Sequence, residues 1–336
     1  MSTGARIAIT GTGAAVGDIV RGNDDPVFAY VIANPPPNRD IFDGLTYRRV
    51  LGPGQTVVSI AAGAALQAME RAGIDASQVD LLVGAATMGE NFAPSALTQV
   101  HAYMQLPSTC RVLALNSEYS PFVDGLRVAN DMVAAGSVKC ALVVAACAWT
   151  QHMDYHQAVC VAASDGAGAA VVTRTDDPAA FALVDWESVT DSSWFGAFRM
   201  APRPVSVPPY YTPSDALYSH ALMALDEVRG AQAVKEFGLP VPVTVVKRLL
   251  ERAGLVPSQI ALVPHQTSTL VEGYWKSNIN PGAYISTVHD YADMVSATAA
   301  VNLATCADQI TQDHMVILGI GMEMHATALL YSRQRS

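Results

Sequence analysis

An internal repeat constrains the fold of this chain more than any other feature. Residues 68–87 (AMERAGIDASQVDLLVGAAT) match residues 249–268 (LLERAGLVPSQIALVPHQTS), since both contain Glu-Arg-Ala-Gly, then Ser-Gln, then an apolar run. Each copy predicts an amphipathic helix that ends at a glycine, a short loop and a buried strand. We therefore expect a chain built from two related halves.

A weaker repeat lies downstream, because residues 120–146 and 294–321 both have the order helix, polar turn, apolar strand. Helices that alternate with apolar runs indicate βαβ units and sheets covered on both faces. We place the halves at residues 1–175 and 215–336. Residues 176–214 are rich in Asp, Ser, Trp and Pro, which favours a loop excursion or linker. Its aromatic side chains are expected to shape a substrate tunnel, a dimer contact or a lid: Trp186, Trp194, Phe195, Phe198, Tyr210 and Tyr211.

Charge and cysteine usage exclude several classes of protein. The formal net charge is -10 and no basic stripe is present, which argues against broad nucleic-acid binding. No signal peptide and no uninterrupted apolar stretch of about 18 residues is visible, so no membrane span is expected. The five cysteines form no Cys-x-x-Cys pair and predict reduced thiols in a cytoplasmic protein. His152 and His156 have helical spacing but lack a third ligand, so no metal site is expected.

Polar residues gather at predicted strand-to-helix corners, where α/β folds place their sites. One corner is NSEYS at 116–120, a second carries His265 in VPHQTS, and a third carries Asp293 before a predicted helix. Tyr119 and Asp293 occupy similar places in the two halves, so a pseudo-two-fold arrangement would bring them together near His265. The turn GIGMEMHA after residue 318 can present backbone N–H groups to an oxyanion.

Five motifs in order make the chain resemble the thiolase-fold β-ketoacyl-acyl-carrier-protein synthase III family over nearly its full length: LNSEYSPFVDGL, ASDGAGAAVV, PHQTS, ADMVSATAA and LGIGMEM. The resemblance implies an α/β thiolase-like fold, with two similar halves in five layers, α-β-α-β-α. It also implies an acyl-CoA or acyl-carrier-protein thioester as substrate and no permanently bound cofactor. A homodimer, or a heterodimer of the same shape, would follow, with the apolar strand at 140–147 near the interface.

The chain departs from the family at its catalytic positions. The family's cysteine nucleophile falls on Tyr119, its histidine on His265 and its asparagine on Asp293. The oxyanion glycines fall near Gly321 and Met322. Loss of both the cysteine and the asparagine argues against ordinary decarboxylative condensation.

The arginine that the family places near the coenzyme A adenine falls on Gln157. The His265–Asp293 pair resembles the branch of the family that transfers acyl groups to oxygen or nitrogen in secondary metabolism, such as antibiotic biosynthesis. We therefore predict an acyltransferase in which Asp293 orients His265, stabilises its protonated form and makes it a stronger base.

Two alternatives remain open at this stage. The chain could be a non-catalytic subunit that caps or regulates an active ketosynthase-like partner. It could instead be a starter-unit ketosynthase that carries the acyl group on Ser120, although a serine at this place is more simply an N-cap. Tyr119 is a poor covalent carrier, because the pKa of a phenol is about 10.

Overall fold

The computed structural model describes residues 5–36, 40–89, 91, 93–203, 220–225 and 227–334. Its main sheet has the strand order β12-β11-β13-β14-β8-β1-β7-β6-β4-β5. The strands of the N-terminal half are β1 (Arg6–Val16), β4 (Leu81–Thr87), β5 (Arg111–Ala114), β6 (Cys140–Cys147) and β7 (Gly166–Thr175). Those of the C-terminal half are β8 (Phe181–Thr190), β11 (Ile260–Pro264), β12 (Ala283–Tyr284), β13 (His314–Gly321) and β14 (His325–Ser332).

The two halves have the same topology. The first half runs β5-β4-β6-β7-β1 and the second β12-β11-β13-β14-β8, so each strand has a counterpart at the same place. The halves meet where β1 and β8 pair antiparallel, with Ala8 opposite Ala182. The repeat seen in the sequence forms α2 (Val57–Ala72) with β4, and α6 (Pro240–Ala253) with β11. Both helices end at a left-handed glycine, Gly73 at φ 66° and Gly254 at φ 67°.

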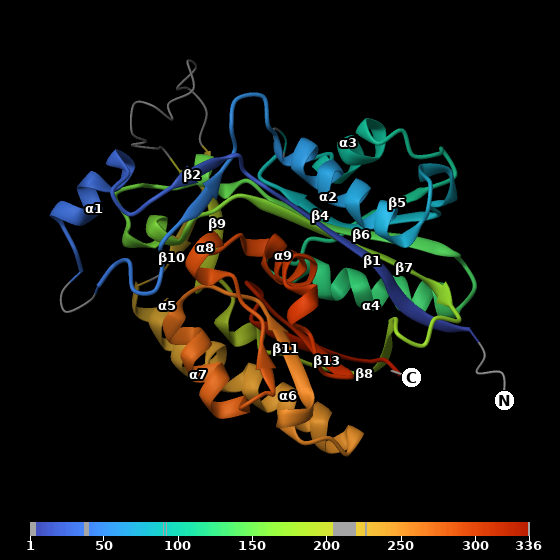
Figure 1. Ribbon diagram of the computed structural model, residues 1–336. Coiled ribbons are helices and arrows are strands. Elements are labelled where there is room, and N and C mark those ends of the chain that lie inside the picture. Colours follow the sequence, from blue (N-terminus) through green and yellow to red (C-terminus); the bar gives the residue numbers. More distant parts are fainter. Residues whose placement is uncertain are drawn as a thin grey trace.

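Helices cover both faces of each half and complete five layers (Figure 1). Helices α2 and α3 (Ala96–Tyr103) pack on the outer face of the N-terminal half, and α6 and α7 (Thr269–Ile279) lie on the C-terminal side. Helices α4 (Pro121–Ala134) and α9 (Thr298–Thr305) lie between, and each contacts strands of both halves. The expected five-layered, thiolase-like fold is confirmed.

Shorter elements decorate these layers. Strands β2 (Ile19–Arg21) and β3 (Arg48–Val50) form one small sheet, and β9 (Phe198–Arg203) and β10 (His220–Leu225) form another. The remaining α-helices of the described chain are α1 (Ala29–Ala33), α5 (Glu227–Ala233) and α8 (Val288–Tyr291). No described helix is both long enough and apolar enough to cross a bilayer.

One sequence-based expectation was wrong in detail. Residues 176–214 are not a loop throughout, because 181–190 form β8, in which the exposed Val184, Trp186, Ser188 and Thr190 alternate with less exposed residues that include Asp185 and Glu187. Tyr210 and Tyr211 lie outside the described residues. Strand β6 lies inside the sheet, because it pairs with β4 and β7 on its two sides and every residue in it is buried; its nearness to a dimer interface stays a prediction.

Candidate active site

Tyr119 forms the tip of a strained elbow between β5 and α4. Its φ of 72° lies in the left-handed region, which is unfavourable for a bulky L residue and commonly marks a functional site. Pro121 starts the helix at its first position, where a missing N–H does no harm. The elbow points the Tyr119 ring into the interior.

His265 and Asp293 converge on this tip. His265 follows β11 and its backbone N–H donates to Leu318 O at 2.8 Å. The Tyr119 ring meets the His265 ring edge-on, with centroids 5.1 Å apart and planes at 81°. Asp293 follows α8, and its Oδ1 lies 4.0 Å from His265 Nε2. The sequence prediction that these three side chains would share one site agrees with this geometry.

The three side chains line a mostly apolar cavity of about 170 Å³. Its walls come from segments far apart in the sequence and include Phe198, one of the aromatic residues expected to line a tunnel. The other apolar walls include Trp149, Trp275, Val271, Met322 and Met324. An enclosure of this kind, with few polar groups, suits the acyl part of a substrate.

Burial sets the protonation of the pair. It lowers the pKa of His265 to about 3, despite the opposing effect of the Val295 backbone. It raises the pKa of Asp293 to about 8, although the Val295 N–H donates to Asp293 Oδ1 at 2.7 Å and acts in the other direction. Both groups are therefore neutral near pH 7, because each charged form loses its hydration in this cavity.

The structure shows no hydrogen bond by which Asp293 would orient His265, so that role stays a prediction. At 4.0 Å the two side chains make no hydrogen bond, and neither ring nitrogen of His265 has a hydrogen-bond partner. The histidine is a neutral base with an unused lone pair. Tyr119 is held neutral too, since burial raises the pKa of its phenol well above 10 and the nearby Asp293 acts in the same direction.

The turn expected to supply oxyanion donors lies beside the cavity. Both Gly321 and Met322 line it. The Met322 N–H, however, donates to Glu118 O at 3.1 Å. That amide is engaged within the protein and does not point freely at a substrate oxygen.

Ser120 and Gln157 do not reach the cavity. Ser120 occupies the N-cap position of α4, but its side chain caps no backbone N–H and is fully buried. Gln157 precedes a short 3-10 helix, and its Nε2 donates to Asp154 Oδ2 at 3.3 Å. Neither residue is among the side chains that line the cavity.

Glu118 precedes Tyr119 in the elbow segment at 116–120, and the sequence alone assigned it no role in the site. It accepts a hydrogen bond from Ser296 Oγ at 3.0 Å, and burial raises the pKa of its carboxyl to about 7. Its position next to Tyr119 was the only sequence feature that could have marked Glu118 as a residue of the site. Together with Asp293, it makes the surroundings of His265 rich in carboxyl groups that burial keeps protonated to unusually high pH.

Gln266 was also missed, although it adjoins His265. It is fully buried, donates from Nε2 to Ala292 O at 2.6 Å and accepts at Oε1 from Thr287 N at 3.1 Å and Asn302 Nδ2 at 3.0 Å. Gln266 thereby ties the loop of His265 to the loop of Asp293. Within the described part of the chain, no group of three or more His, Cys, Asp or Glu side chains could hold a metal ion.

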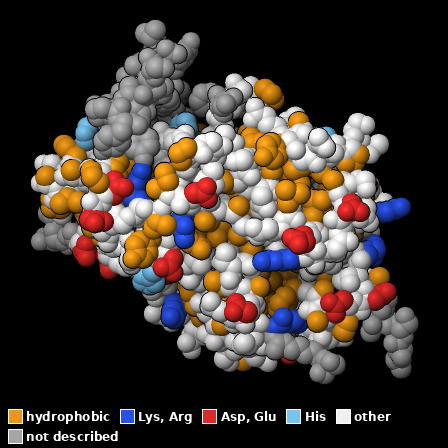
Figure 2. All heavy atoms as spheres, turned by 45° about the horizontal axis from the view of Figure 1, so that its top comes forward, with side chains coloured by type: hydrophobic (Ala, Val, Ile, Leu, Met, Phe, Trp, Pro, Cys, Tyr) orange, Lys and Arg blue, Asp and Glu red, His pale blue; other side chains and the backbone are white. Residues whose placement is uncertain are grey.

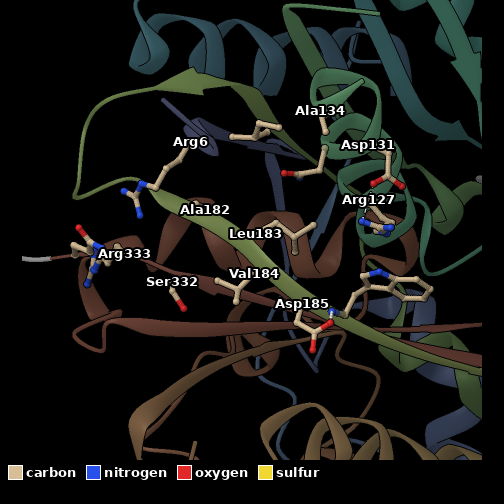
Figure 3. Close-up of a pocket in the computed structure, with 14 residues that line it drawn as sticks. Arg6, Arg127, Asp131, Ala134, Ala182, Leu183, Val184, Asp185, Ser332 and Arg333 are labelled. Atoms are coloured by element: carbon tan, nitrogen blue, oxygen red, sulfur yellow. Dashed lines mark hydrogen bonds and ion pairs between the residues drawn. The ribbon is translucent and has the colours of Figure 1, made fainter. Parts of the chain in front are cut away.

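A larger hollow, of about 660 Å³, lies at the other end of α4 (Figure 3). Three arginines line it, but each has protein partners: Arg6 binds the Pro178 carbonyl, Arg127 pairs with Asp131, and Arg333 binds the Ile310 carbonyl. None of the predicted catalytic or oxyanion residues reaches this hollow, although Trp186, one of the aromatic residues expected to shape a tunnel, lines it. The cavity at Tyr119 is therefore the site that the fold assembles.

Fold and site together are similar to those of thiolase-fold proteins, and the comparisons with known proteins point to 3-oxoacyl-acyl-carrier-protein synthase III enzymes. The model of the family "3-Oxoacyl-[acyl-carrier-protein (ACP)] synthase III" matches residues 113–192, which include the elbow. The chain is similar to a β-ketoacyl-acyl-carrier-protein synthase III of Neisseria meningitidis, with 25% identity over 83% of this chain and 84% of the relative. It is 27% identical to that of Gloeobacter violaceus, over 85% of this chain and 87% of the relative.

Solved structures agree on the fold. The 3-oxoacyl-acyl-carrier-protein synthase III of Aquifex aeolicus superposes with a TM-score of 0.82 at 20% identity, covering 97% of this chain and 99% of the other. The priming β-ketosynthase of the R1128 polyketide pathway superposes with a TM-score of 0.80 at 21% identity, covering 100% of this chain and 99% of the other. The chain thus has a thiolase-like fold.

Proposed function

We propose that this protein is an acyltransferase that moves an acyl group from a coenzyme A or carrier-protein thioester to a hydroxyl or amine of a natural product. The observation that carries the proposal is the apolar cavity in which Tyr119 stands against an unpartnered, neutral His265. Similarity to a priming β-ketosynthase of a polyketide pathway supports a place in natural-product biosynthesis.

The proposed reaction uses His265 as the base. Burial keeps the His265 imidazole unprotonated near pH 7, and the ring accepts the proton of the acceptor O–H or N–H as that atom attacks the thioester carbonyl. The tetrahedral intermediate collapses, the C–S bond breaks, and the thiolate takes the proton from the imidazolium. In this reaction Asp293, which burial keeps protonated near pH 7, donates a hydrogen bond to the developing oxyanion.

Direct transfer requires no acyl-enzyme. Tyr119 is a poor covalent carrier, because burial keeps its phenol protonated. Ser120 is fully buried and does not line the cavity. Tyr119 therefore has a packing role in this proposal. Its ring fills the place where a nucleophile would stand, and it determines which face of the His265 ring meets the acceptor.

One observation favours a second function, that of a non-catalytic subunit. The Met322 amide is bonded to Glu118 O, so a backbone donor that would bind an oxyanion is occupied. A subunit that only shapes its partner would not need this donor. The two functions differ in whether the protein alone releases thiol from an acyl thioester when an acceptor is present.

We also propose a homodimer that forms through the N-terminal half. Strand β5 ends the main sheet and pairs, among described strands, only with β4, so its other edge can join an identical strand. The face that Figure 2 brings forward carries hydrophobic side chains between charged ones. Light scattering after size exclusion tests the dimer, and a monomer over the whole working concentration range would contradict it.

The test of the function is a thiol-release assay on the purified protein with a panel of acyl thioesters and hydroxyl or amine acceptors. His265→Gln should lower kcat/KM by about 10²–10⁴-fold, the usual effect of losing a positioned base. The matched control is His314→Gln, since His314 bonds Ser332 Oγ at the far end of the β13–β14 pair. Unchanged turnover in His265→Gln, or no acceptor-dependent release by the wild type, overturns the proposal.

A further inference from the structure

His325 lies directly behind the turn that lines the cavity. It opens β14 and pairs with Gly321 across the β13–β14 hairpin. A Cβ placed on Gly321 would stand 2.2 Å from His325 Cε1, so the ring fills the space that the missing side chain leaves. Glycine at position 321 is therefore required by the histidine as well as by the cavity on its other face.

The ring of His325 joins the two segments that carry Tyr119 and Met322. Its Nε2 lies 2.6 Å from Ser120 Oγ, one residue past Tyr119, and 3.5 Å from Asp124 Oδ2. Its Nδ1 lies 3.6 Å from Glu323 Oε2, one residue past Met322. The histidine thus bridges the elbow and the turn.

The hydrogen bonds fix which atom carries a proton. Ser120 Oγ donates its only proton to Asp124 Oδ2 at 2.8 Å. At 2.6 Å from Nε2 it can therefore only accept, so Nε2 bears a proton directed at the serine. This polarity is the reverse of a Ser–His pair that activates a nucleophile, and it argues against an acyl group on Ser120.

We propose that His325, as an imidazolium held between Asp124 and Glu323, is a positioning residue that clamps the Tyr119 elbow to the Gly321–Met322 turn. Its effect on catalysis rests on the proposed acyl transfer at this site. Two carboxylates, one beside each ring nitrogen, make the doubly protonated ring the favoured form. The clamp holds the elbow in its left-handed conformation and sets the distance between the elbow and the turn.

The groups around the ring agree with a positive charge. Helix α4 presents Asp124 and Ser120, the turn presents Glu323, and β8 places the uncharged Thr190 opposite His325. Burial acts to lower the pKa of His325, but the hydrogen bond and charge of Asp124 and the charge of Glu323 outweigh it and raise that pKa above 6.5.

The same contacts act on the carboxyl of Asp124. Burial acts to raise its pKa, yet bonds from His325 and the nearby serines lower it below 3.8.

The pH dependence of the clamp follows from the raised pKa of His325 and the lowered pKa of Asp124. The raised pKa of His325 means that its stabilisation is complete below about pH 6.5 and is lost as the pH rises through the folded-state pKa. The lowered pKa of Asp124 means that the contribution of Asp124 to folded-state stability is complete above about pH 4 and is lost as the pH falls further. The clamp is thus closed in mildly acidic solution and opens as the pH rises through the folded-state pKa of His325.

The experiment compares wild type, His325→Gln, Asp124→Asn and the control His314→Gln, which removes a histidine bonded to Ser332 on the same hairpin. The imidazole NMR signal that His325→Gln removes should titrate above pH 6.5 in the wild type and at lower pH in Asp124→Asn. The melting temperature of His325→Gln should fall below that of the wild type at about pH 6, with the gap closing in base. His314→Gln should show no such pH-dependent gap.

Turnover supplies the second readout. Both clamp variants should lose about tenfold in kcat with little change in the KM for the thioester, and the wild-type kcat should fall in base as His325 deprotonates. A His325 signal that titrates below pH 6.5, or variants with wild-type kcat and pH profile, would overturn the clamp. If the wild type transfers no acyl group, the proposed function fails, and the NMR titration and melting data still decide whether the clamp exists.

Discussion

Replacing Asp293 by Asn should stabilise the protein, and by an amount that grows with pH. Burial raises the pKa of Asp293 from 3.8 to about 8, so at pH 7 folding must protonate a carboxylate that is ionised in the unfolded chain. The difference of about 3 pKa units between 3.8 and 7 corresponds to roughly 4 kcal/mol. At pH 5 the same reasoning gives only roughly 1.5 kcal/mol.

Asparagine avoids this cost because it is neutral at every pH. Its Oδ1 can still accept the 2.7 Å hydrogen bond from Val295 N, so the loop keeps its main contact. For a chain of this size, about 2 °C in melting temperature accompanies each kcal/mol. Asp293→Asn should therefore melt about 8 °C above the wild type at pH 7 and about 3 °C above it at pH 5.

Differential scanning calorimetry between pH 5 and 8.5 measures this gap directly. The wild type should be the less stable protein because the pKa of Asp293 is higher in the folded state than in the unfolded chain. The wild-type free energy of unfolding therefore falls as the pH rises from 3.8 to about 8. If the difference in melting temperature does not change with pH, or if Asp293→Asn is less stable than the wild type, the His265–Asp293 pair is not neutral. The result would indicate a charged pair instead.

Two further predictions concern the supports of the site. Gly321→Ala should destabilise the protein by about 1–3 kcal/mol, because its Cβ would stand 2.2 Å from the His325 ring; Gly273→Ala is the control, since that helical position has open space and should be neutral or stabilising. Gln266→Ala should cost roughly 2–4 kcal/mol in thermal or urea unfolding, because the buried Thr287 N–H and Asn302 amide lose their acceptor. A stability loss below about 0.5 kcal/mol in either variant would contradict the contacts assigned to it.

Much of the fold could be predicted from the sequence, because the repeat reports directly on local structure. The Glu-Arg-Ala-Gly segments predicted two helices ending at glycine, and both glycines are left-handed helix ends. Strand β8 was not predicted because polar residues lie on both of its faces. Ser188 and Thr190 lie on the exposed face, and Asp185 and Glu187 lie on the half-buried face, where both accept hydrogen bonds from Arg252.

The site could be predicted only as a list of residues. The family motifs brought Tyr119, His265 and Asp293 together correctly, but the protonation of the pair depends on burial by walls drawn from the whole chain. The contact between Ser120 and His325 joins residues 205 positions apart and leaves no local signal in either segment. Such long-range polar contacts follow from the completed packing of the two halves, and no sequence pattern encodes them.

The central claim is that the acyl group passes to the acceptor without stopping on the protein. Intact-protein mass spectrometry after incubation with an acyl thioester, with and without acceptor, tests it most directly. We predict an unchanged protein mass in both cases and thiol release only when acceptor is present. A mass gain equal to the acyl group, formed without acceptor and removed by adding it, would contradict the account.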